Sequence, residues 1–262
     1  MKKTGYWDLN VSGKEIQNTI STAQTLGFTG ICVGEKFSDL NRFKDQKKEF
    51  SVLQKKSPIE ILIGACIEIR TEGEIQKKAR NAFDCGADLV FFKPKNVDEN
   101  RLASECWEID VLSPPHDTSA RDFMNQREAG IDKVCAKNMA ERSIALEVSL
   151  AQILDSNGRK RAELLGRISQ NLKVAKKYKT QVIFTSGAID PLGMRSPQDF
   201  SAILKVLGAD EKQAKDIITS NVEKIIQKSH DRNDPDVILK GLKVIDWGKQ
   251  KPQEPKKKYG WY

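Results

Sequence analysis

Seven short apolar segments, each followed by a helical pattern, constrain the fold of this chain more than any other feature of its sequence. Predicted strands cover residues 6–11, 29–34, 59–70, 88–93, 109–113, 144–149 and 182–185. Predicted helices, with apolar side chains at helical spacing, cover residues 14–26, 39–55, 72–85, 99–106, 131–141, 161–178, 197–207, 211–218 and 222–230. Apolar strands that alternate with helices form a parallel sheet covered by helices.

Seven strand–helix units within 262 residues favour a TIM-like α/β barrel over an open Rossmann sheet. A candidate eighth strand, DVILKGLKVID at residues 236–246, fits a helix equally well. We therefore expect a distorted barrel of about seven strands over residues 1–248, and whether the eighth strand forms stays open. Residues 249–262 are rich in Pro and Lys and are predicted to be a basic, flexible C-terminal tail.

The composition indicates a protein of the cytoplasm. No run of eighteen apolar residues is present, and the N-terminus lacks the apolar region of a signal peptide, so no membrane association is expected. The five cysteines (Cys32, Cys66, Cys85, Cys106 and Cys135) are dispersed without a CxxC pair. Such spacing is typical of reduced, buried thiols in an intracellular protein.

The chain is basic, with 44 Lys and Arg against 36 Asp and Glu. The tail at 249–262 holds five lysines and one glutamate, so it carries half of the net charge of +8. A basic balance is compatible with nucleic acid or acidic lipid as a partner, and it demonstrates neither.

The segment VIFTSGAIDPLGMRSPQDF at residues 182–200 has the form of a strand end that carries a site. Its apolar run stops at Ser186-Gly187, and a polar loop follows. Ser196, Pro197 and Asp199 then match the capping box that begins a helix. Because barrel proteins place their sites at the carboxyl ends of strands, this loop is either an active site or a binding surface.

The motifs of a self-sufficient enzyme are missing. The sequence has no GxSxG, P-loop or HExxH motif and only two histidines, His116 and His230. A catalytic metal site usually needs several histidines. One alternative remains, a metal-dependent phosphoesterase of the histidinol-phosphatase-like barrel class that uses Glu68, His116, Asp117 and Asp190.

The ordered strand-end motifs resemble the barrel-type protein subunit of ribonuclease P, protein component three in archaea. The resemblance rests on YWDLNV at 6–11, FFKPKN at 91–96, NMAERSIALEVSL at 138–150 and the segment from residue 182 onward. It covers residues 5 to about 226 and leaves out the tail. That family is similar to the polymerase-and-histidinol-phosphatase barrels, which carry an HxH metal motif where this chain has Asp8-Leu9-Asn10. Glu68 stands at the place of a glutamate ligand, and the late histidine near Asp190 is absent.

The resemblance implies a noncatalytic subunit of an endoribonuclease that removes the 5′ leader of precursor tRNA. It implies that the RNA subunit performs the hydrolysis with magnesium, while this chain binds no cofactor or metal. The implied partners are the ribonuclease P RNA, a small ferredoxin-like protein subunit, other ribonuclease P proteins and precursor tRNA.

An RNA-binding role favours Lys and Arg side chains at strand ends and loops, where they contact phosphates and 2′-hydroxyls. The predicted RNA-binding residues are Lys36, Arg70, Lys93, Lys95, Arg121, Arg127, Arg159, Arg161 and Arg195. Arg195 is the strongest candidate, since it precedes a helix N-terminus that attracts anions. An internal ion pair between Arg195 and Asp190 is the alternative.

Overall fold

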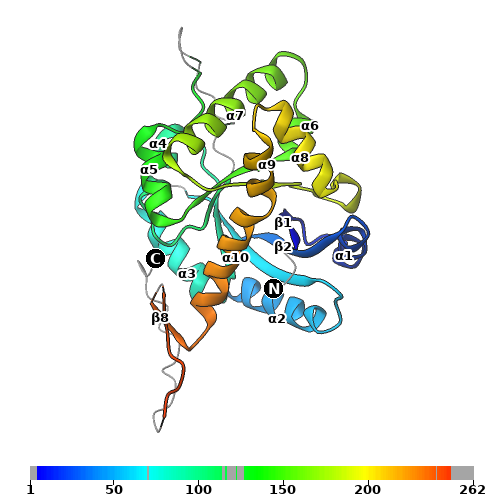
Figure 1. The fold of residues 1–262 in the computed structure, drawn as a ribbon. Helices are drawn as coiled ribbons and strands as arrows, with labels where there is room; N and C mark the ends of the chain where they lie inside the picture. The colour runs from blue at the N-terminus through cyan, green and yellow to red at the C-terminus, as the bar shows by residue number, and fades with distance from the viewer. Residues whose placement is uncertain are drawn as a thin grey trace.

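The predicted strands form one seven-stranded parallel sheet that curves into a nearly closed barrel (Figure 1). The structure is a computed structural model that describes residues 5–69, 71–113, 116, 122, 127–239 and 241–248. The strands follow one another in chain order: β1 (Tyr6–Val11), β2 (Phe28–Lys36), β3 (Glu60–Ile67), β4 (Leu89–Phe92), β5 (Val111–Leu112), β6 (Ala145–Ser149) and β7 (Val182–Thr185). The TIM-like α/β fold is confirmed.

The barrel closes between its first and last strands through few contacts. Val11 and Ala188 form an isolated parallel bridge, and the amide of Ser12 donates to the Ala188 carbonyl at 2.9 Å. The amide of Ser186 also donates to the Asp8 carboxylate across this seam, at 3.0 Å. By contrast, seven residue pairs join β2 to β3 in regular register.

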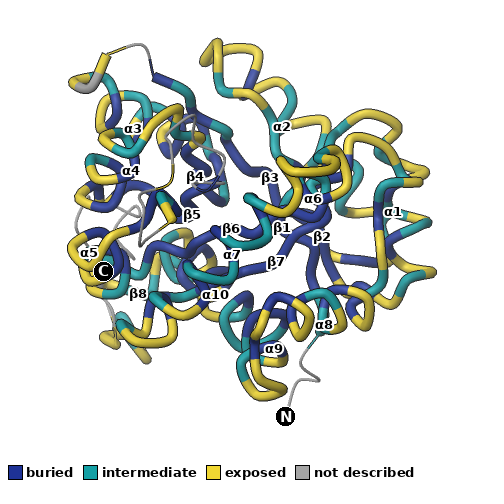
Figure 2. The backbone as a smooth tube through the Cα atoms, turned by 90° about the horizontal axis from the view of Figure 1, so that it is seen from above, coloured by how far each residue is buried: buried dark blue, intermediate teal, exposed yellow. Residues whose placement is uncertain are grey.

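Helices cover the outside of the barrel. They are α1 (Ile16–Thr25), α2 (Leu40–Gln54), α3 (Ile75–Asp84), α4 (Val97–Ser104), α5 (Lys133–Arg142), α6 (Leu150–Asp155), α7 (Gly158–Tyr178), α8 (Pro197–Val206), α9 (Glu211–Ile218) and α10 (Ser220–Asn233), with short 3₁₀ turns η1 (Glu72–Glu74) and η2 (Pro191–Gly193). Seen from above, buried strands occupy the centre and exposed helix faces lie at the periphery (Figure 2).

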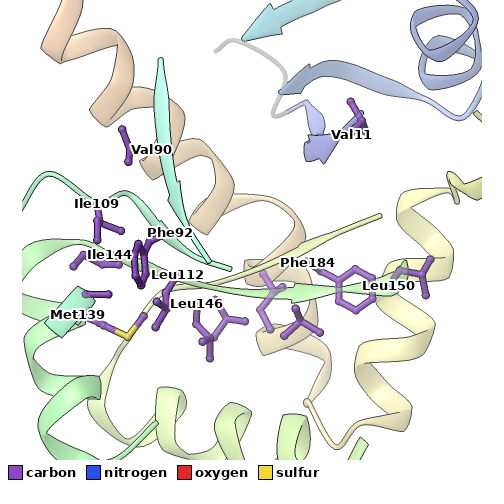
Figure 3. Packing of buried hydrophobic residues seen from close by; sticks show 14 of the residues in the cluster. Val11, Val90, Phe92, Ile109, Leu112, Met139, Ile144, Leu146, Leu150 and Phe184 are labelled. Atoms are coloured by element: carbon purple, nitrogen blue, oxygen red, sulfur yellow. The ribbon is translucent and has the colours of Figure 1, made fainter. Parts of the chain in front are cut away.

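The apolar core has two layers, one between the sheet and the helices and one inside the barrel. The outer layer includes Phe92, Leu112, Met139 and Phe184 (Figure 3). The inner layer consists of Trp7, Leu9, Cys32, Leu62, Leu89, Phe91, Val111, Ala145 and Ile183, together with three residues of α10. Glycine makes room inside, because a Cβ at Gly30 would lie 2.5 Å from the Trp7 ring and one at Gly64 would lie 2.6 Å from the Phe91 ring.

Helix α10 covers the amino-terminal end of the barrel. Val222, Ile225 and Ile226 pack into the inner core layer. Ser229 Oγ donates to the carbonyl of Asp88, just before β4, at 2.6 Å, and Asn221 donates to the carbonyl of Val182 at 2.9 Å.

Buried charges fix α10 in place as well. The Asp110 carboxylate, fully buried before β5, lies 2.9 Å from Lys228 Nζ and 2.6 Å from Arg232 Nη2. The two cations hold the pKa of Asp110 at about 2, against the effect of its burial. One end of the barrel is therefore sealed by a helix.

The stretch 236–246 does not supply an eighth barrel strand. It forms a separate antiparallel hairpin of β8 (Val237–Leu239) and β9 (Leu242–Lys243), which projects from the body (Figure 1). Lys243 pairs with Asp234 at 2.7 Å, and Trp247 Nε1 donates to Asp236 at 2.8 Å. The hairpin is closed by its own side chains. The predicted tail at 249–262 lies outside the described residues.

Candidate functional site

All seven strands are parallel, so their carboxyl ends and the loops after them lie at one end of the barrel, opposite α10. We call this end the mouth. The loop between β7 and α8 is tightly organised. Gly187 has φ of +61°, and a Cβ there would lie 2.2 Å from Ser149 Oγ, so the turn requires glycine. Asp190 Oδ1 accepts the amide of Gly193 at 3.0 Å. The predicted capping box of Ser196 and Asp199 is confirmed.

Arg195 does not pair with Asp190. Its Nη1 donates to the carbonyls of Leu192 and Met194, both at 2.7 Å, and the side chain stays on the surface. The guanidinium therefore fixes the loop through its carbonyl groups and retains its positive charge next to the N-terminus of α8. This geometry removes the internal ion pair that the sequence left open.

Six other predicted RNA-binding residues are described: four lie at the end of a strand or in the loop after it, and Arg159 and Arg161 lie in the first turn of α7. Together with Arg195 they are the rim cations: Lys36, Lys93, Lys95, Arg127, Arg159, Arg161 and Arg195. Lys36 ends β2 and lies 3.6 Å from Glu68, and Lys95 Nζ donates to the Ile69 carbonyl at 2.9 Å. Lys93 directly follows β4 and is exposed.

The three arginines, Arg127 in the loop after β5 and Arg159 and Arg161 in the first turn of α7, also have partners within the chain. Arg127 lies 3.8 Å from Asp122, Arg159 pairs with Glu163 at 2.8 Å, and Arg161 donates to the carbonyls of Ser156 and Leu154. Since these contacts leave the side chains exposed, the rim cations remain accessible to a large anion. Arg70 and Arg121 lie outside the described residues.

Beneath the rim cations, the barrel holds a buried polar layer. Glu147 of β6 is fully buried, and its Oε1 accepts hydrogen bonds from Asn10 Nδ2 at 2.8 Å and from Thr185 Oγ1 at 2.5 Å. Gly34 makes room for this layer, because a Cβ there would lie 2.6 Å from Asn10 Oδ1. Burial raises the pKa of Glu147, while the hydrogen bonds and the Lys93 charge oppose that rise. Glu147 thus joins β1, β6 and β7.

Asp8 is the second buried carboxyl group of this region. Its Oδ1 accepts the Ser186 amide at 3.0 Å, which links β1 to the end of β7. Burial raises the pKa of Asp8 to about 6, and the hydrogen bonds that it accepts limit the rise. Both carboxyl groups are therefore engaged in holding strands together at the barrel mouth.

The three described residues of the phosphoesterase alternative, Glu68, His116 and Asp190, do not assemble into a site. Glu68 pairs with Lys36, and Asp190 caps η2. His116 is fully buried beside Asn171 of α7, at 3.4 Å between its Nδ1 and the amide nitrogen. Burial lowers the pKa of His116 to about 3, so the ring is neutral at physiological pH. Within the described part of the chain, no three His, Cys, Asp or Glu side chains gather as a metal site would require. Asp117 lies outside the described residues.

Two residues that organise the barrel were not singled out from the sequence. Glu147 stands alone in the apolar strand IALEVS, and Asp110 stands in EIDVL. A single carboxylate within an apolar strand is a signal for a buried, partnered group. The partners themselves, Asn10 and Thr185 for Glu147 and Lys228 and Arg232 for Asp110, are set by tertiary packing.

We compared the chain with known protein families. The family model described as RNase P subunit p30 matches residues 5–234, from the start of β1 to the end of α10. The chain belongs to the RNase P subunit p30 family. The resemblance seen in the sequence is thereby confirmed, and the β8–β9 hairpin follows the matched region.

Two relatives match this chain over nearly their whole length. Ribonuclease P protein component 3 of Methanothermobacter thermautotrophicus is 26% identical over 246 residues, which cover 92% of this chain and 95% of that protein. The protein of the same name from Methanosarcina acetivorans is 29% identical over 233 residues, 88% of this chain and 89% of its own.

A similar fold is seen in a solved structure. A chain of the cryo-EM structure of archaeal ribonuclease P with mature tRNA matches with a TM-score of 0.77 and 23% identity, and the match covers 93% of this chain and 100% of that one. At this identity, the likeness shows the shared fold. None of the described helices of our chain is long and apolar enough to cross a lipid bilayer.

Proposed function

We propose that this chain is a noncatalytic protein subunit of ribonuclease P, which supports the RNA subunit in removing the 5′ leader of precursor tRNA. The observation that carries the proposal is the p30 family match over residues 5–234. The near full-length relatives named ribonuclease P protein component 3 support the same role.

The division of labour in this proposal assigns the hydrolysis to the RNA subunit and its magnesium ions. The carboxyl groups of the barrel mouth support it, because Asp8 and Glu147 are hydrogen-bonded to neighbouring strands and Asp190 caps a turn. Groups used in this way are not arranged as a nucleophile with its base. The chain contributes positive charge and shape, and it binds no cofactor of its own.

The partners follow from the same role. We assign the rim cations to the ribonuclease P RNA, and we include the small ferredoxin-like subunit, the other ribonuclease P proteins and precursor tRNA in the assembly. The particle acts in the cytoplasm, an assignment that the unpaired thiols of all five cysteines support.

Reconstitution tests the proposal. Cleavage of precursor tRNA is measured with the RNA subunit and the other protein subunits, with and without this chain, over a titration of magnesium. We expect the chain to raise the rate and to lower the magnesium concentration that half-maximal cleavage needs, and a heat-denatured sample to do neither. Unchanged cleavage in the presence of the folded chain would overturn the proposal. So would stoichiometric zinc or manganese on the purified chain with phosphoesterase turnover.

A further inference from the structure

Helix α2 carries a large share of the positive charge of this protein. Residues 40–56, α2 and the two residues after it, contain six Lys or Arg and two acids, for a net charge of +4. The tail at 249–262 also carries +4. The rest of the chain has 33 basic and 33 acidic residues, so its net charge is zero. Among the described residues, those outside 40–56 include 28 basic and 32 acidic side chains, so residues 40–56 form a segment of net charge +4 on a body whose remaining net charge is −4.

Most of this charge is not neutralised inside the molecule. Lys47 pairs with Asp88 at 2.5 Å, and Lys48 pairs with Asp45 on the surface at 3.0 Å. Arg42, Lys44, Lys55 and Lys56 are exposed and have no ion pair with any residue that the structure describes. Four cations along one short segment repel one another, which destabilises the isolated protein.

The order of charges along α2 is also unfavourable for a free helix. Arg42 lies in the first turn of α2, and this turn contains no acidic residue. Lys44 follows immediately after this first turn. Cations near a helix N-terminus oppose the helix dipole. Only the Asp39 carboxylate, which caps the amides of Asn41 and Arg42 at 2.9 Å, acts in the opposite sense.

The core does not explain the exposed face of α2. Phe43 is its single buried residue; it packs edge-on against Phe37, with 5.4 Å between ring centroids. Gln46 donates to Glu35 at 2.9 Å, and a cavity of about 570 Å³ lined by Lys47, Phe50, Gln54 and the start of β3 lies beside the helix. The helix packs on the barrel through Phe43 and the partly buried Phe50 and Leu53, and these contacts do not involve its exposed lysines.

Three lysines form one exposed stripe on this helix. Lys48 lies four residues after Lys44, and Lys55 lies eleven residues after it. On an α-helix, residues at this spacing lie on nearly the same face. The stripe is roughly 16 Å long at 1.5 Å per residue. Helix α2 follows β2, which ends at the rim cation Lys36, so its N-terminal end lies on the mouth side, and the helix runs along the outside of the barrel (Figure 1).

We propose that α2 is a second RNA-binding element, which holds the sugar–phosphate backbone of an RNA through Lys44, Lys48 and Lys55. This inference rests on the proposed function. A polyanion relieves the repulsion among Arg42, Lys44, Lys55 and Lys56, and it can replace Asp45 as the partner of the exposed Lys48. Lysines on a helix contact phosphates as point charges. The contact is therefore independent of RNA sequence and sensitive to salt.

Binding of the folded chain to ribonuclease P RNA at 50 to 200 mM salt tests this element. The variant Lys44→Gln/Lys48→Gln/Lys55→Gln is compared with the wild type. Loss of three phosphate contacts should reduce the slope of log K against log salt by about two to three units. The ratio of wild-type to variant affinity should then be roughly 15- to 65-fold larger at 50 mM than at 200 mM.

Two control variants keep the test specific. Lys44→Arg/Lys48→Arg/Lys55→Arg retains the charge and should retain the slope. Lys212→Gln/Lys215→Gln/Lys224→Gln removes three exposed lysines from α9 and α10; α9 lies across the barrel from α2 (Figure 2), and the slope should change by less than one unit. Melting temperatures measured alongside should not fall in the α2 variant, since its repulsion is reduced.

The outcomes separate this inference from the function on which it rests. If the wild type neither binds the RNA nor supports cleavage, the proposed function fails. If the wild type does both while the α2 variant keeps its salt slope, the α2 inference is wrong and the function stands. An unchanged slope with lost binding of the small protein subunit would assign α2 to a protein partner instead, and it would also overturn the inference.

Discussion

Two buried aspartates hold opposite ends of the barrel and have opposite proton affinities. Asp8, near the mouth, accepts hydrogen bonds from Ser186 and from the Asn10 amide in a buried site, and burial raises its pKa to about 6. Asp110, at the closed end, faces Lys228 and Arg232, and its pKa falls to about 2. Burial acts on both groups in the same direction, so the paired cations account for the difference.

For Asp8 we predict that replacement by Asn flattens the pH dependence of stability. The folded pKa of about 6 lies above the ordinary 3.8, so the contribution of Asp8 to stability is greatest below pH 4 and is lost as pH rises through 6. Asn keeps an oxygen for the Ser186 amide without the charge. The fall in unfolding free energy from pH 4 to pH 8 should shrink by about 2 kcal/mol in the variant. Denaturant titrations at each pH measure this fall. If the pH profiles of wild type and Asp8→Asn ran parallel, the prediction of a raised pKa for Asp8 would be wrong. The variant Asp190→Asn, at an exposed position, is the control.

For Asp110 we predict a large loss of stability on replacement by Asn. The change leaves Lys228, whose side chain is 4% exposed, and Arg232 without a countercharge. Removing one partner of a buried ion pair costs about 3–5 kcal/mol. Because the pKa of Asp110 is depressed, its stabilisation is present above pH 3.8 and is lost as pH falls through 2. Chemical denaturation is the measurement. The control is Asp234→Asn, which removes the surface pair of Asp234 with Lys243 and should change the free energy of unfolding little. A similar loss of stability in both variants would contradict the special role of Asp110.

The rim cations yield a third prediction at this scale. Arg195→Ala, and separately Lys93→Ala with Lys95→Ala, should weaken binding to the ribonuclease P RNA. Each lost phosphate contact should lower the salt slope by about one unit. Binding isotherms at several salt concentrations, with Lys212→Ala as control, measure this. Slopes that match the wild type in both variants would remove the mouth as the RNA site.

At the scale of elements, the sequence was sufficient to place nearly every helix and strand within a few residues. Apolar spacing marks the helices, and local chemistry such as the box of Ser196 and Asp199 marks their ends. The stretch at 236–246 remained ambiguous, because three apolar residues in a row fit several structures. Its hairpin depends on contacts such as Trp247 with Asp236, which the pattern of apolar residues does not encode.

Truncations test which elements the barrel needs. A chain that ends at Gly248 should keep its melting temperature, because the residues removed are not part of the predicted core. A chain that ends at Thr219 lacks α10, with Val222, Ile225 and the partners of Asp110, and should not fold cooperatively. Thermal unfolding followed by circular dichroism distinguishes the two. A large fall for the first, or a cooperative transition for the second, would contradict the division into barrel, α10 and tail.

At the scale of the whole molecule, the sequence predicted the barrel and the class of partner, but not where the charge lies. The tail was recognised as half of the excess charge, whereas the other half on α2 became apparent only when the helix was seen to bury Phe43 alone. Whether a lysine faces an acid within the fold depends on tertiary structure. The same reason hid the roles of Glu147 and Asp110, whose partners come from distant segments.

The scarcity of contacts between β1 and β7 has a consequence for synthesis on the ribosome. Strand β1 emerges first, but Ala188, to which Val11 pairs, follows 177 residues later, and α10 follows later still. Until then β1 through β6 can form only an open sheet with two bare edges, and exposed edges invite pairing with other chains. During synthesis, β1 therefore stays an edge strand until β7 has formed, and this edge is where the nascent protein is most exposed to aggregation.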